Sequence, residues 1–244
     1  MRVLIVYAHP EPTSFTAALK DAAVSALSAA GHSVEVSDLY GEGFNPVAGR
    51  HDFTSAADGD RFHYQTEQLH ASDTNGFASD LRREQERLSR ADLVIFVFPL
   101  WWGGLPAILK GWFDRVCAYG VAYADGRRFE KGYFVGRRAM LGVTTGGTIE
   151  RFSADGAYGE IGDVLYPVRR CVLEYLGLDV MEPFVAYAAP RVDPPTRAEY
   201  LRRWKASLLT TVGDTVWQER LASLTDIALG NRSAPVKNDW ALQR

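Results

Sequence analysis

Cysteine is scarce in this 244-residue chain: Cys117 and Cys171 are its two cysteines, and they lie far apart. The sequence contains no Cys-x-x-Cys pair and no Cys/His cluster with zinc spacing. A disulfide framework is therefore not expected, and neither is a metal site. Each cysteine stands among apolar residues at helical spacing, so we expect both to be small buried hydrophobic side chains.

An excess of charge of either sign is also missing. The chain has 27 basic and 30 acidic residues, which gives a formal net charge of −3. A nucleic-acid partner would need a basic excess or cluster, so none is expected. No apolar run reaches membrane-spanning length, and the start MRVLIVYAHP lacks the features of a signal peptide. We therefore expect a cytoplasmic protein without stable membrane insertion.

What the sequence does contain is a regular alternation of short β-branched runs and helical patterns. Strands are expected at residues 2–8, 33–39, 93–98, 139–143 and 180–187, and helices at about 15–30, 78–90, 106–118, 163–176 and 196–221. This alternation predicts an α/β fold, a doubly wound five-stranded parallel sheet with helices on both faces. Residues 40–77 show no such pattern, and they are too numerous for an idle connection. We expect one folded domain over residues 1–222 and a C-terminal extension over 223–244.

Three loops that follow strands carry unusual residues, and the carboxyl ends of parallel strands are where ligands bind in such sheets. The loop from His9 to Phe15 leads into a helix N-terminus, which suits a phosphate group, although simple N-capping by Thr13 or Ser14 explains it equally well. The loop PLWWGGLP, from Pro99 onward, favours a wall for a planar ligand over a packed loop. The loop TTGG (residues 144–147) offers backbone N–H groups that can stabilise negative charge.

Together these loops predict a planar cofactor that carries phosphate, and a flavin meets both requirements. The sequence lacks a G-x-G-x-x-G motif and a Walker lysine loop. A Rossmann site for a nicotinamide cofactor and a P-loop NTPase are therefore unsupported.

The segments LIVYAHPEPTSF, ADLVIFVFPLWWGGLPAILKGWFDRV and TTGG, in this order, resemble the NAD(P)H:quinone reductases of the DT-diaphorase family. The similarity extends from the first strand to about Trp204. It implies a flavodoxin-like fold, a homodimer and bound FAD rather than FMN. The implied reaction is a two-electron reduction of a quinone by NAD(P)H, in ping-pong order through the flavin, with azo and nitro compounds as further acceptors.

The resemblance also implies roles for individual residues. The positions for the FAD phosphates and ribityl chain are His9, Phe15 and Thr16. Those along the isoalloxazine are Pro99, Leu100, Trp101, Trp102 and Gly103, with Thr144, Thr145, Gly146 and Gly147 at its pyrimidine side. Arg197 lies near the adenosine, and His63 stands where a family glutamine approaches the adenine. Tyr123, Asp125 and Tyr175 match positions that the partner subunit contributes to the substrate pocket.

The chain departs from the family at the catalytic pair. Where the animal enzymes have a tyrosine and a histidine after TTGG, this chain has Phe152 and Tyr158. Phe152 can stack on cofactor or substrate but cannot donate a hydrogen bond, whereas Tyr158 can donate one. We therefore expect Tyr158 and the backbone amides of Gly146 and Gly147 to stabilise the charge of the reduced flavin.

Two alternative functions stay open. The first is a flavin-binding regulatory subunit of a membrane transporter, for which residues 223–244 are the candidate contact segment. The second is a flavodoxin-like electron carrier without its own hydride-donor site, which the two-tryptophan loop disfavours. The physiological acceptor and the choice between NADH and NADPH are left open.

Overall fold

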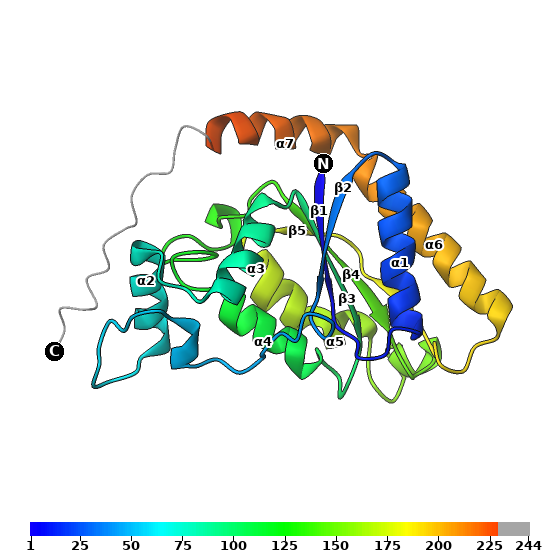
Figure 1. The fold of residues 1–244 in the computed structure, drawn as a ribbon. Helices are drawn as coiled ribbons and strands as arrows, with labels where there is room; N and C mark the ends of the chain where they lie inside the picture. The colour runs from blue at the N-terminus through cyan, green and yellow to red at the C-terminus, as the bar shows by residue number, and fades with distance from the viewer. Residues whose placement is uncertain (229–244) are drawn as a thin grey trace.

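The β-branched runs of the sequence form a central parallel sheet in the computed structural model, which describes residues 1–228 (Figure 1). Its strands are β1 (Arg2–Tyr7), β2 (Ser33–Asp38), β3 (Leu93–Pro99), β4 (Arg138–Thr144), β5 (Asp179–Val180) and β6 (Phe184–Ala186). The strand order is β2-β1-β3-β4-β5, every pairing is parallel, and β6 also pairs with β4. The expected five-stranded, flavodoxin-like sheet is confirmed.

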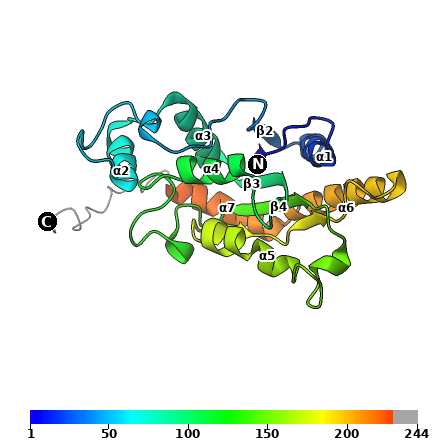
Figure 2. The same ribbon diagram turned by 90° about the horizontal axis from the view of Figure 1, so that it is seen from below.

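Helices cover both faces of this sheet (Figures 1 and 2). They are α1 (Phe15–Ala29), α2 (Tyr64–Thr74), α3 (Ser79–Arg90), α4 (Ala107–Val116), α5 (Ile161–Val168), α6 (Pro194–Val212) and α7 (Thr215–Ala228). Side chains alternate along β1, so that Val3 and Ile5 pack with α1 and α6, whereas Leu4 and Val6 pack with α3, α4 and α5. The central strands are therefore buried on both faces, which explains the apolar runs within β1, β3 and β4. The edge strand β2 instead alternates polar and apolar residues.

The last third of the chain differs from its expected elements. The fifth strand is split into β5 and β6, because Pro183 stands between them and cannot donate to a strand ladder. The helix expected over residues 163–176 is α5, which contains Pro167 and continues as a π-helix over Arg169–Glu174. The helix expected over residues 196–221 is interrupted at Gly213, between α6 and α7.

The predicted domain boundary falls inside a helix, since α7 runs across residues 222 and 223 to Ala228. The remainder of the predicted C-terminal extension, 229–244, lies outside the described residues. Over residues 1–228, the structure contains no helix that is long and apolar enough to cross a membrane.

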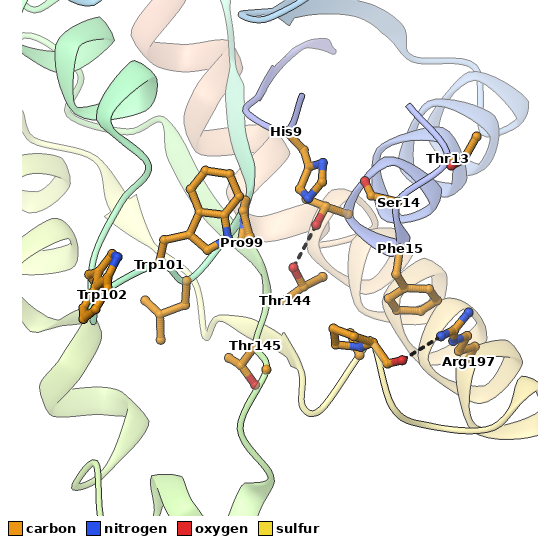
Figure 3. Close-up of a pocket in the computed structure, with 15 residues that line it drawn as sticks. His9, Thr13, Ser14, Phe15, Pro99, Trp101, Trp102, Thr144, Thr145 and Arg197 are labelled. Carbon is orange, nitrogen blue, oxygen red and sulfur yellow. Dashed lines mark hydrogen bonds between the residues drawn. The ribbon is translucent and has the colours of Figure 1, made fainter. Parts of the chain in front are cut away.

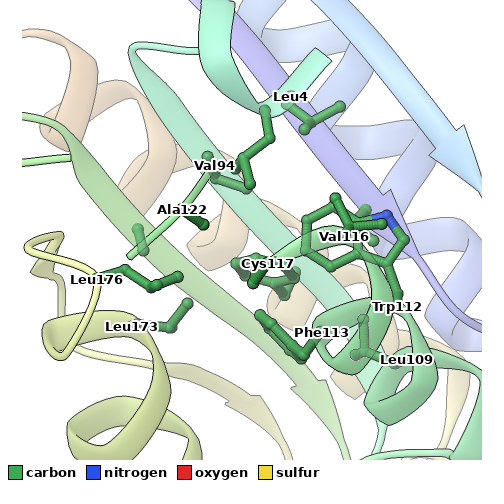
Figure 4. Close-up of a cluster of buried hydrophobic side chains, with 14 of the residues drawn as sticks. Leu4, Val94, Leu109, Trp112, Phe113, Val116, Cys117, Ala122, Leu173 and Leu176 are labelled. Carbon is green, nitrogen blue, oxygen red and sulfur yellow. The ribbon is translucent and has the colours of Figure 1, made fainter. Parts of the chain in front are cut away.

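The two cysteines occupy different environments. Cys117 lies in the cluster between the sheet and α4 (Figure 4), where burial raises the pKa of its thiol to about 12. Cys171 is exposed on the π-helical turn, so the expectation that it would be buried is wrong. Helical spacing alone did not reveal which face of this segment points outward.

Residues 40–77, which show no regular hydrophobic pattern, form a packed segment that we call the excursion. It contains α2, a helix whose sequence is not amphipathic. This segment meets α4 at Gly111, where a Cβ atom would lie 2.2 Å from the carbonyl oxygen of Pro46 and 2.5 Å from its Cα. Both contacts are with backbone, which cannot swing aside as a flexible side chain can.

We expect Gly111→Ala to lower the free energy of unfolding by about 1–3 kcal/mol, through overpacking of this contact. Gly162→Ala, in α5 with open space around the position, is the matched control. Because alanine favours helix more than glycine, the control should be neutral or stabilising by up to about 1 kcal/mol. Urea unfolding of both variants measures the difference, and equal stabilities would show that the contact is not tight.

Candidate functional site

A cavity of about 600 Å³ opens at the carboxyl ends of the strands (Figure 3). It lies where the strand order reverses, with β2 on one side of β1 and β3 on the other, which is the usual ligand position in doubly wound sheets. Its size is typical of a small-molecule site. The lining residues are His9, Thr13, Ser14, Phe15, Thr16, Pro99, Leu100, Trp101, Trp102, Thr144, Thr145, Gly146, Ala189, Pro190 and Arg197.

The N-terminus of α1 forms one wall of the cavity. Of the two candidate caps, Ser14 is the N-cap, and its hydroxyl accepts from the Ala17 N–H at 3.1 Å. Thr13 is instead bonded to the carboxylate of Glu11 through its hydroxyl (2.7 Å) and its N–H (2.8 Å). The N–H groups of Phe15 and Thr16 belong to the first turn, which has no intrahelical acceptors, so they are suited to bind an anion.

His9 contributes a neutral donor next to this helix end. The Glu11 N–H donates to His9 Nδ1 at 3.0 Å, and burial lowers the pKa of the imidazole. A neutral ring whose Nδ1 accepts must carry its proton on Nε2, which can donate to a phosphate oxygen. The ring also packs against Trp101, with centroids 5.9 Å apart.

The two tryptophans are held by a tight turn that follows β3. Trp101 and Gly104 exchange two backbone hydrogen bonds of 3.1 and 3.0 Å, with Trp102 and Gly103 at the tip. Both tip residues have positive φ, 52° for Trp102 and 70° for Gly103. This conformation is strained for a tryptophan, and the Trp102 indole is fully exposed at the edge of the cavity. Strain and exposure together are typical of a position kept for function.

The floor of the cavity is formed where β4 ends. The buried hydroxyls of Thr16 and Thr144 lie 2.8 Å apart and connect α1 to β4. Thr145 donates its hydroxyl to the Gly147 carbonyl at 2.8 Å, and the Arg191 guanidinium donates to the Gly146 carbonyl. The TTGG loop is therefore held rigidly beside the cavity.

The far end of the cavity, opposite the tryptophans, carries a cation from α6 (Figure 3). Arg197 donates to the Pro190 carbonyl at 3.3 Å and leaves other guanidinium N–H groups available. Sequence reasoning missed Ala189 and Pro190 as lining residues. The available signal was their place after the fifth strand, whose carboxyl end lies beside that of β4.

Other predicted site residues lie beside this cavity. Phe152 and Tyr158 pack against each other with centroids 5.0 Å apart and lie over Gly147, where a Cβ atom would be 2.9 and 3.1 Å from their rings. Gly103 stands at the turn tip beside Trp102.

The remaining predicted residues lie away from the cavity. His63 is the N-cap of α2 in the excursion. Tyr123 and Tyr175 pack edge to face at 5.7 Å, and burial raises the pKa of Tyr123. Asp125 joins this group through a 2.8 Å hydrogen bond from Arg128, whose guanidinium also covers the ring of Tyr175. We call Tyr123, Asp125, Arg128 and Tyr175 the tyrosine cluster. Over residues 1–228, no group of three or more His, Cys, Asp or Glu side chains could hold a metal ion.

Comparison with known proteins places this site in a family. The family model described as "Flavodoxin-like fold" matches residues 1–208. NAD(P)H dehydrogenase [quinone] 1 of Rattus norvegicus is 42% identical over 219 residues, which cover 89% of this chain and 78% of the rat protein. Ribosyldihydronicotinamide dehydrogenase [quinone] of Pongo abelii is 40% identical, over 89% of this chain and 93% of its own length.

A solved structure agrees with these sequence relatives. The putative quinone reductase from Klebsiella pneumoniae superimposes with a TM-score of 0.82 at 40% identity, over 89% of this chain and 85% of that chain. The family model covers the three loops that line the cavity. The chain therefore belongs to the flavodoxin-like family that includes these quinone dehydrogenases.

Proposed function

We propose that the chain is an NAD(P)H:quinone oxidoreductase that binds FAD in the cavity after β1, β3 and β4. The observation that carries the proposal is the joint presence, in one cavity, of an anion-binding helix end, an exposed tryptophan and a rigid glycine loop. The relatives' names point to the same reaction.

The residues present fit a flavin. The indoles of Trp101 and Trp102 suit a planar ring, and the first turn of α1 with His9 suits phosphate. In the TTGG loop, the Thr145 N–H donates to the Ala186 carbonyl, so the N–H groups of Gly146 and Gly147 are the ones offered to the ring edge. A bound flavin supplies the hydride chemistry, so the protein's part is to bind, orient and stabilise charge. NAD(P)H and then the quinone occupy the same space in turn, which is a ping-pong order.

FAD is preferred over FMN because the cavity continues beyond the phosphate-binding helix end to Arg197. A guanidinium at that end suits the adenosine half of a dinucleotide. The packed segment of residues 40–77, which contains His63, offers a further surface for the adenine. We also propose that the protein is a homodimer. In that dimer, the tyrosine cluster of one protomer completes the acceptor pocket of its partner.

The first experiment records the visible spectrum of the purified protein before and after NAD(P)H is added without oxygen. Flavin bands that bleach and then return when a quinone is added support the reductase. Chromatography of the released cofactor separates FAD from FMN. A colourless protein that takes up no flavin contradicts the proposal. A bound flavin that NAD(P)H does not reduce also contradicts it, and favours a flavin-binding carrier or regulatory role.

Arg197→Met tests the adenosine end separately. We expect its Kd for FAD to rise about tenfold, because one charge-assisted contact is worth about 1.5 kcal/mol. Its Kd for FMN should change less than twofold. Arg202→Met, on the same helix but paired with Glu199 in solvent, is the control and should leave both affinities unchanged. Equal losses for FAD and FMN would contradict the assignment of Arg197. Fluorescence titration of flavin-free protein measures these affinities.

A further inference from the structure

Beside the TTGG loop, the segment of residues 150–158 brings the guanidinium of Arg151 close to the hydroxyl of Tyr158. Arg151 Nη1 donates to the Tyr158 hydroxyl oxygen at 3.3 Å, and the guanidinium carbon lies 6.0 Å from the ring centroid. Tyr158 is half exposed, and its ring lies over Gly147, the neighbour of the cavity residue Gly146.

The pairing is built into the local backbone. The Tyr158 N–H donates to the Arg151 carbonyl at 2.9 Å, and the Gly156 N–H donates to the Ser153 carbonyl at 2.9 Å. A Cβ atom at Gly156 would lie 2.4 Å from the Glu150 carbonyl oxygen and 2.6 Å from that of Arg151, so the loop closes tightly on itself. Phe152 supports the Tyr158 ring from the side. Arg151 and Tyr158 are therefore brought together by the loop itself.

The chemistry of the two groups determines the direction of the hydrogen bond. A guanidinium has donors and no acceptor, so the Tyr158 oxygen must accept from Arg151. The single hydroxyl proton of Tyr158 is then free to be donated elsewhere. A hydrogen bond from a cation also polarises the hydroxyl and makes it a stronger donor.

We propose that Arg151 is a positioning residue that holds Tyr158 as a hydrogen-bond donor toward negative charge on the reduced flavin. The proposal rests on the flavin site proposed above. Through this pair, a cation supports the reduced form without touching the flavin. Arg191, which donates to the Gly146 carbonyl, adds a second positive charge beside the same loop.

The test is the two-electron midpoint potential of the bound flavin, measured at one neutral pH by equilibration with dyes of known potential. We expect Arg151→Met and Tyr158→Phe each to weaken the reduced form about tenfold relative to the oxidised form, a potential about 30 mV more negative. Arg151→Lys keeps the cation and should recover more than half of that shift. Arg202→Met is the control and should leave the potential unchanged.

The double variant separates the two ways in which Arg151 could act. In the Tyr158→Phe background, Arg151→Met should add less than half of its single-variant shift, because the hydroxyl that it acts through is gone. A full additional shift would overturn the positioning role, and so would an Arg151→Met potential equal to that of the parent. Each variant must first bind flavin stoichiometrically and bleach with NAD(P)H. Failure of the parent protein at that step contradicts the proposed function, whereas a flavin that bleaches at an unchanged potential contradicts this inference alone.

Discussion

Arg115→Met is expected to lower the free energy of unfolding by about 3–5 kcal/mol, the cost of removing one partner of a buried ion pair. The Arg115 side chain is 1% exposed and that of Asp52 is 0% exposed, and the two are joined by hydrogen bonds of 2.7 and 2.9 Å. Arg115 also donates to the Asn45 carbonyl. Tyr64 donates to the other oxygen of Asp52 at 2.6 Å. The variant leaves a buried carboxylate without its cation.

Urea unfolding measures this loss, and Lys110→Met on the same helix is the control. Lys110 forms an exposed pair with Asp114, so its removal should cost less than about 0.5 kcal/mol. Adding Asp52→Asn to Arg115→Met should restore part of the stability, because the uncompensated charge is then absent. A loss of less than about 1 kcal/mol in Arg115→Met would show that the excursion is held to α4 mainly by other contacts.

Trp102→Asn is expected to act in opposite directions on stability and on flavin binding. Asparagine adopts positive φ more readily than tryptophan, and the exposed indole loses no packing, so the free energy of unfolding should rise by about 1 kcal/mol. The planar wall of the cavity is lost at the same time. Since one aromatic stacking contact contributes about 0.5–1.5 kcal/mol, the Kd for flavin should rise up to about tenfold.

Both effects are measured on one preparation, by urea unfolding of the flavin-free protein and by fluorescence titration with flavin. Val216→Asn, which replaces an exposed apolar side chain on α7, is the control and should change neither quantity appreciably. An unchanged affinity in Trp102→Asn would mean that the indole does not contact the cofactor. A loss of stability would mean that the turn is not strained at this residue.

A helix or strand could be predicted from the sequence wherever a single hydrophobic pattern extends over the whole element. The runs that became β1, β3 and β4 are apolar at nearly every position because both sheet faces are covered there, and this signal needs no knowledge of the partners. Elements with mixed environments were less predictable. α2 buries only Glu67, Gln68 and Ala71, so its sequence carries no hydrophobic periodicity, and its stability comes from contacts with residues far along the chain.

The candidate site was predictable to the extent that its residues follow strands. The loops after β1, β3 and β4 converge because parallel strands end at the same edge, and their composition pointed to a planar phosphate-bearing ligand before any geometry was known. The choice of Ser14 over Thr13 as the helix cap depended on the Glu11 carboxylate, which binds Thr13. Tyr158 was expected from the family resemblance, but Arg191 and Arg151 carry no motif, so their roles beside the TTGG loop came from the structure alone.

By itself, the sequence determined the fold class, the three ligand loops and the family resemblance, because these depend on residues that are neighbours along the chain. Only the tertiary structure decided which charges are buried and which hydroxyls are free to donate. Nothing in the local sequence distinguishes Arg115 from Arg202. In the structure, however, Arg115 is buried and paired with Asp52, whereas Arg202 is exposed to solvent. The burial of Arg115 depends on Asp52, a partner 63 residues away that it meets only when the chain has folded. The direction of the Arg151–Tyr158 hydrogen bond depends on a loop that only the folded chain closes.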